Sequence, residues 1–158
     1  MRKHFRAMMT ALVVVAASPA LALAAPDAVT AESSIKLDKV ITENGQTRHE
    51  LVAPQKVVPG NHLVFLTAYH NTSDKPVTGF IVTNPVSPAV LLESLSSDTF
   101  DVSIDGGKTW GKLAQLTVVK PGAAPRAAES GDVTTVRWNV PVIAPGASGS
   151  LEYHAVVR

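Results

Sequence analysis

The stretch VVPGNHLVFLTAYHNTSDKPVTGFIVTNP, residues 57–85, decides the fold. A turn at Pro59 and Gly60 opens a first predicted strand, and a polar turn that begins at Asn71 leads to a second strand over residues 77–83. The side chain of Asn71 can hydrogen-bond its own backbone and hold this corner. The sequence predicts that the two strands pair with each other.

The first of these strands is apolar on both faces, which is typical of a central strand that is covered twice or abuts another element. The side chains that we expect to face the core are Leu63, Phe65 and Tyr69. The opposite face carries three further apolar residues, Val64, Leu66 and Ala68. We expect these outward residues, and exposed strand edges, to be contact points for a partner.

Strand and turn patterns continue on either side of this stretch. Upstream, Asn44 and Gly45 form the strongest short hairpin signal, between strands predicted over residues 35–42 and 47–52. Downstream, a last pair of strands is joined across Pro145 and Gly146, and the further predicted strand segments are 89–95, 100–104, 110–119, 133–140 and 150–157. We therefore predict an all-β fold, an antiparallel Ig-like β-sandwich of about eight or nine strands.

The first 24 residues have the pattern of a secretory signal peptide. An apolar run over residues 11–20 is followed by small residues at Ala22 and Ala24, and the basic residues before it are Arg2, Lys3 and Arg6. A transmembrane anchor is the alternative, but this run is shorter than the roughly 20 residues that span a bilayer. We expect cleavage after Ala24.

Cleavage would remove 24 of the 158 residues and leave 134, which suits a single domain. We expect a flexible leader over residues 25–33 and one β-sandwich domain over residues 34–158, with a mobile loop at 120–131. The chain has no cysteine, which excludes a disulfide framework and a lipid anchor on cysteine.

The charge of the mature chain narrows the classes of partner. Three of the 14 basic residues leave with the signal peptide, so 11 basic residues face 13 acidic ones, a net charge of about −2. This balance gives no support to nucleic acid or an anionic membrane surface as a partner. We expect a periplasmic or secreted protein with no integral membrane segment after cleavage, whose partner is another envelope protein.

The order of turn residues along the chain has a counterpart in a known family. Pro59-Gly60 is followed by Phe65, Asn71, Pro76 and Asn84-Pro85, and the C-terminal part adds Val136-Arg137-Trp138 and IAPGAS at 143–148. Over residues 34–158 the chain resembles the conserved-repeat domain of bacterial and archaeal surface proteins, catalogued as the eleventh domain of unknown function. Ser73 and Asn84 stand where that family commonly has Gly and Asp. The resemblance implies an Ig-like sandwich outside the cytoplasm and brings no catalytic residues.

Residues 103–110, SIDGGKTW, match the Asp-box hairpin S-x-D-x-G-x-T-W of sialidases and other propellers. In sialidases this hairpin is structural, and a propeller would repeat it every ~40–50 residues. The match occurs once here, so we interpret it as a structural turn in which an aspartate accepts backbone donors. The predicted turn residues are Ser103, Asp105, Gly107, Thr109 and Trp110, together with Pro59, Gly60, Asn71, Pro145 and Gly146.

Four histidines lie outside the predicted signal peptide, without the close spacing of metal ligands: His49, His62, His70 and His154. His70 and His154 each follow a tyrosine and could meet across strands, with Asp74 nearby. A periplasmic metal-binding protein is therefore one alternative function, although solvated histidines at strand edges are the simpler interpretation.

The sequence has no G-x-S-x-G elbow and no phosphate-binding glycine loop. We predict no enzyme and no cofactor. The expected function is a non-enzymatic exported module for cell-envelope structure or protein–protein interaction. The main alternative is a carbohydrate-binding or glycosidase-accessory domain, which would require Trp110 and Trp138 to present ring faces to solvent.

Overall fold

The computed structural model describes residues 28–93 and 99–158. The predicted signal peptide and cleavage site, the start of the predicted leader and part of the predicted segment 89–95 lie outside the described residues. Within them the chain forms ten β-strands, short 3₁₀ turns and no α-helix. No helix in this part of the chain has the length and hydrophobicity that a membrane span requires.

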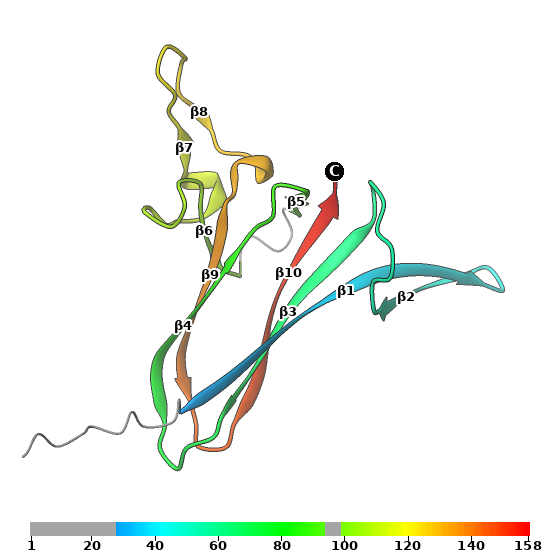
Figure 1. Ribbon diagram of the computed structural model, residues 1–158, viewed down its shortest axis with the longest axis vertical. Helices are drawn as coiled ribbons and strands as arrows, with labels where there is room; N and C mark the ends of the chain where they lie inside the picture. The colour runs from blue at the N-terminus through cyan, green and yellow to red at the C-terminus, as the bar shows by residue number, and fades with distance from the viewer. Residues whose placement is uncertain (1–27, 94–98) are drawn as a thin grey trace, which may run out of the picture.

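Two antiparallel sheets contain most of the strands (Figure 1). The larger sheet has the order β2-β1-β3-β10-β5, with the bounds Gln46–Val52, Val29–Glu43, His62–Asn71, Ser148–Val157 and Val90–Leu92. The smaller sheet has the order β4-β9-β6, with the bounds Val77–Pro85, Thr135–Ile143 and Asp101–Ser103. This arrangement confirms the predicted all-β antiparallel sandwich, with ten strands instead of eight or nine.

The core lies between the two sheets and is centred on aromatic rings. Tyr153 of β10 is 1 % exposed and stacks on Phe65 of β3, with ring centroids 4.5 Å apart. Phe100 and Trp138 meet edge to face at 5.2 Å. The predicted core face of β3 is therefore correct, since Phe65 packs against this cluster and Leu63 is buried within it.

Only part of the face of β3 that was predicted to point outward is exposed to a binding partner. Val64 is 1 % exposed, so it cannot act as a surface contact point. The reason is the central position of β3, where Lys36 of β1 and His154 of β10 lie directly opposite Val64 on its two sides. Leu66 is half-buried and Ala68 is exposed.

Two predicted hairpins are instead connections between the sheets. β3 and β4 were expected to pair, as were β9 and β10, but each pair is divided between the larger and the smaller sheet. Apolar side chains on both strands of each pair face the core, and the rings of Tyr69 and Phe80 meet across it with centroids 6.0 Å apart. The polar turns after Asn71 and at Pro145 are therefore corners of the sandwich.

The first hairpin follows the sequence prediction and extends further. Asn44 and Gly45 have φ angles of 52° and 76°, the left-handed values that a tight hairpin turn of this kind requires. β1 begins at Val29, so residues 29–33 of the predicted leader are strand and pair with β3. Their side chains are mostly exposed, so this part of the strand lacks the alternation that would have revealed it.

The segment after β6 departs from the prediction of a return strand over residues 110–119. Gly111 forms a single bridge with Val102, and a 3₁₀ turn over Leu113–Gln115 follows. β7 (Thr117–Val118) then pairs with β8 (Arg126–Ala127) in a small separate sheet. The loop at 120–131 is therefore fastened at its base by backbone pairing.

Candidate functional sites

The end of the β1–β2 hairpin extends beyond the rest of the larger sheet. β1 pairs with β3 only as far as Asp38, whereas its pairing with β2 continues to Glu43. Beyond Asp38 the hairpin is a two-stranded ribbon, and Figure 1 shows it projecting away from the smaller sheet. We call residues 38–52 the hairpin arm.

The hairpin arm exposes apolar side chains. Val40 and Leu51 are 55 % and 50 % exposed, and their register places them on one face with Asp38 and His49. Asp38 lies opposite Leu51 and His49 lies opposite Val40, so the contact of 2.9 Å between the His49 ring nitrogen and an Asp38 carboxylate oxygen runs between the two apolar side chains. The outer face of the arm thus carries two exposed apolar side chains with one histidine–carboxylate pair between them.

A second histidine–carboxylate pair lies on the same face of the larger sheet. The Nδ1 atom of His62 is 2.6 Å from Glu93, which follows β5 and reaches across β10. His154 lies beside them, with its Nδ1 atom 4.0 Å from Glu93 and its Nε2 atom 3.5 Å from Glu152. Histidines and acids therefore alternate across one end of the sheet.

The predicted pairing of His70 with His154 does not occur. His70 lies opposite Ser148 on β10 and approaches its hydroxyl to 2.9 Å, whereas His154 lies six residues further along the strand, roughly 20 Å away. Within residues 28–93 and 99–158 no three His, Asp or Glu side chains are placed to hold a metal ion.

The Asp-box segment forms a tight network of hydrogen bonds around Ser103 and Asp105. The Asp105 carboxylate accepts from the backbone amide of Thr109 at 2.9 Å and from its hydroxyl at 2.7 Å, and the Ser103 hydroxyl donates to it at 2.7 Å. These bonds hold the pKa of Asp105 well below its usual value. Ser103 is fully buried and also accepts from the amide of Gly107 at 2.8 Å.

Trp138 offers no open ring for a sugar, and Trp110 is half-buried with one ring face covered. Trp138 is 5 % exposed and belongs to the core. The indole NH of Trp110 donates to the carbonyl of Gly107 at 2.9 Å, and the Arg137 guanidinium lies 4.3 Å above its ring centroid. Gly107 has a φ of 91°, and a Cβ there would lie 3.3 Å from the Trp110 ring.

Asn71 joins the two sandwich corners. Its side-chain amide is completely buried and donates to the carbonyls of Lys75, Ile143 and Ala144 at 2.8, 3.0 and 3.1 Å. Its side-chain oxygen accepts from Ser73. The backbone of Asn71 also bonds across the corner at Pro145 and Gly146, to Ala147 and Gly146. Asn71 therefore does more than the local turn bond that the sequence predicted.

The turn at Pro59 and Gly60 is fixed to the C-terminal strand. Gly60 has a φ of 87°, and its amide donates to the carbonyl of Val157 at 2.8 Å. The side-chain oxygen of Asn61 accepts from the amide of Val58 at 3.0 Å.

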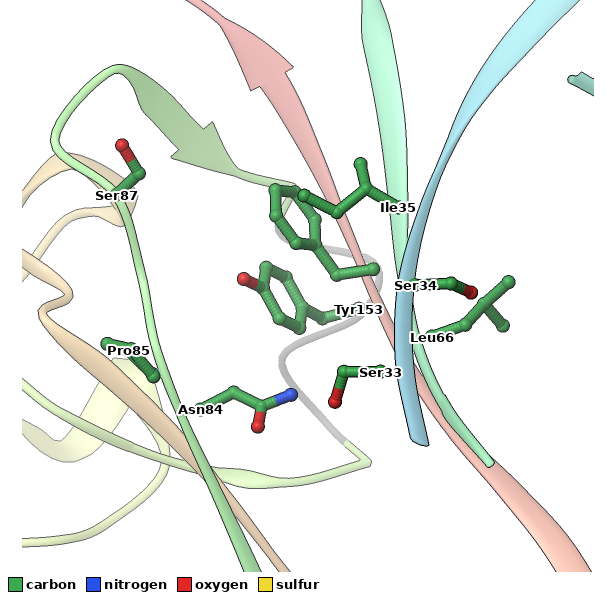
Figure 2. A pocket seen from close by; sticks show the side chains of 9 residues that line it. Ser33, Ser34, Ile35, Leu66, Asn84, Pro85, Ser87 and Tyr153 are labelled. Atoms are coloured by element: carbon green, nitrogen blue, oxygen red, sulfur yellow. The ribbon is translucent and has the colours of Figure 1, made fainter. Parts of the chain in front are cut away.

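A pocket of about 430 Å³ opens between the two sheets. Figure 2 shows Ile35, Ser33 and Tyr153 projecting into it from the larger sheet and Asn84 facing them from β4, while Ser34 and Leu66 project to the far side of β1. The remaining lining residues are Phe65, Pro85 and Ser87. No sequence pattern predicted this pocket, because it combines four strands that are distant along the chain.

The polar wall of the pocket is organised by Thr67, which is 2 % exposed. Its hydroxyl lies 3.0 Å from the hydroxyl of Ser33 and accepts from the side-chain amide of Asn84 at 3.1 Å. Thr67 thereby links β1, β3 and β4. Among the described residues, none forms a hydrogen bond with the hydroxyl of Tyr153.

No family model, curated protein or solved structure matches this chain. The resemblance to the conserved-repeat domain of surface proteins therefore stays a prediction from the turn residues.

Proposed function

We propose that the protein is a non-enzymatic, exported Ig-like module that binds another envelope protein through the hairpin arm. The export part of the proposal rests on the signal-peptide pattern of the first 24 residues. The binding part rests on the shape and composition of the arm.

One observation carries the proposal: exposed apolar side chains concentrate around the arm. Among the described residues, five of the eight large apolar side chains that are exposed fall within residues 35–58: Ile35, Val40, Leu51, Val57 and Val58. Ile35 and Val57 line a pocket on the core side of the larger sheet, whereas Val40 and Leu51 share its outer face. Exposed apolar side chains that lie together on one surface mark interaction sites more often than scattered ones do.

The pairing pattern of the arm supports the same proposal. A two-stranded ribbon is marginally stable by itself, and residues 39–43 have no third strand beside them. Contact with a partner would bury Val40 and Leu51 together with the His49–Asp38 pair that lies between them.

The experiment is affinity capture from the envelope fraction with the mature protein, residues 25–158. We expect one partner to be recovered with the wild type and lost with the double variant Val40→Glu/Leu51→Glu. The matched control is Ile81→Glu, because Ile81 is 57 % exposed but lies on the smaller sheet. Equal capture by the double variant, or loss with Ile81→Glu, would contradict the proposal.

The geometry does not favour a carbohydrate-binding function. Stacking on a sugar needs an accessible aromatic face, whereas Trp138 is buried and Arg137 covers one face of Trp110. The metal-binding alternative has no support either, since His70 and His154 lie far apart on the larger sheet.

A further inference from the structure

The pocket between the sheets contains a tyrosine hydroxyl for which the described part of the chain supplies no hydrogen-bond partner. Tyr153 is 99 % buried, and its hydroxyl makes no hydrogen bond to any residue in the described part of the chain. Every fully enclosed side-chain nitrogen or oxygen in this part has a partner, so the hydroxyl must reach the open volume of the pocket. Figure 2 shows it directed from β10 toward the β4 side.

The chemistry of the lining restricts what can occupy the pocket. None of its nine lining residues carries a charge. Ile35, Phe65 and Pro85 supply apolar surface, while Ser33 and Asn84 already bond to Thr67. Burial raises the pKa of Tyr153 to about 12, so its hydroxyl stays protonated and remains able to donate at neutral pH.

From this geometry we propose that the pocket binds a small, uncharged and mainly apolar molecule whose carbonyl or other neutral acceptor takes a hydrogen bond from the Tyr153 hydroxyl. The volume of about 430 Å³ lies within the range of small-molecule sites, roughly 300–1,000 Å³. An unpaired buried hydroxyl costs free energy, and an acceptor on the ligand recovers it. An anion would lose its hydration without meeting a cationic side chain.

This site is separate from the surface proposed for protein binding. The pocket lies between β1, β3, β4 and β10, whereas Val40 and Leu51 lie on the opposite face of the larger sheet. An experiment that refutes protein binding through the arm therefore leaves the proposal for the pocket untouched, and the reverse also holds.

Ligand binding in this pocket can be tested with prodan. Prodan is a neutral naphthyl ketone whose emission shifts to the blue in apolar surroundings. We expect saturable binding to the mature protein at one site. Tyr153→Phe should weaken binding about three- to tenfold, as loss of one hydrogen bond does, and leave the melting temperature unchanged or raised. Tyr69→Phe is the matched control, because the Tyr69 ring does not line this pocket.

Three further measurements locate and define the site. Ile35→Arg, at a residue that is 45 % exposed, should weaken prodan binding more than Tyr153→Phe does, because it places a charge at the pocket. The anionic probe anilinonaphthalene sulfonate should not compete with prodan. Val40→Glu/Leu51→Glu should leave prodan binding unchanged.

The proposal is overturned by any of three results. The first is no saturable blue shift with the wild type. The second is equal affinity in wild type and Tyr153→Phe. The third is a clear fall in the melting temperature of Tyr153→Phe, which would reveal a structural partner for the hydroxyl.

Discussion

The buried side-chain amide of Asn71 donates a hydrogen bond of 3.0 Å to the carbonyl oxygen of Ile143, 72 residues along the chain. Asn71 ends β3 and Ile143 ends β9, so this bond ties one crossing between the sheets to the other. The side-chain amide and the backbone of Asn71 thus join the two corners at this end of the sandwich.

Replacement of Asn71 should strongly destabilise the fold. Asn71→Ala leaves the carbonyls of Ile143, Ala144 and Lys75 without this donor, and we expect the free energy of unfolding to fall by about 2–4 kcal/mol. Chemical denaturation measures the change. Asn61→Ala, which removes one exposed bond to Val58, should cost less than about 1 kcal/mol, and equal losses would refute the corner role.

The Asp-box turn makes a second prediction for stability. Ser103 is fully buried, and Ser103→Ala removes the acceptor for the amide of Gly107. We expect a loss of about 1–3 kcal/mol in thermal or chemical unfolding. Ser150→Ala, at an exposed position of β10, is the control and should be close to neutral.

Stability should depend on pH through Asp132. The bidentate bonds from Arg126, at 2.6 and 2.7 Å, and a backbone bond from Glu129 lower the pKa of Asp132 to about 2. Because the folded pKa lies below the value of 3.8 for the free side chain, this contribution is present above pH 3.8 and is lost as the pH falls toward 2.

Melting curves of the wild type and Asp132→Asn from about pH 5 to pH 2 measure this effect. Their difference in melting temperature should be largest at the upper end and shrink as the pH falls. A difference that is constant over this range would show that the Arg126–Asp132 pair does not stabilise the fold.

The pairing of Gly149 with Tyr69 gives a prediction for packing. The two residues lie directly opposite each other on β10 and β3, and a Cβ at position 149 would overlap the Tyr69 phenol. Gly149→Ala should therefore destabilise by about 1–3 kcal/mol. In a double-mutant cycle with Tyr69→Ala, the cost of Gly149→Ala should largely disappear, and additive effects would show that the overlap is not its cause.

Features that depend on local chemistry were predictable from the sequence. Asn44 and Gly45 both accept positive φ, so their hairpin could be placed without knowledge of the rest of the fold. The alternation of Leu63 and Phe65 likewise identified the core face of β3. In both cases the deciding residues are neighbours along the chain.

Features that depend on which strands meet were not predictable in this way. The turn after Asn71 has the residues of a hairpin, and its role as a corner depends on Ile143 and Ala144. Alternation places Tyr153 on one face of β10, but the open volume at its hydroxyl exists only because β4 and β1 stand on either side.

The most direct test of the proposed function is site-specific photo-crosslinking in the living cell. A photoreactive amino acid is placed at Leu51 on the hairpin arm or at Ile81 on the smaller sheet, two positions that are similarly exposed. We predict one discrete crosslinked envelope protein from position 51 and none from position 81. No crosslink at position 51, or the same product from both positions, would contradict binding through the arm.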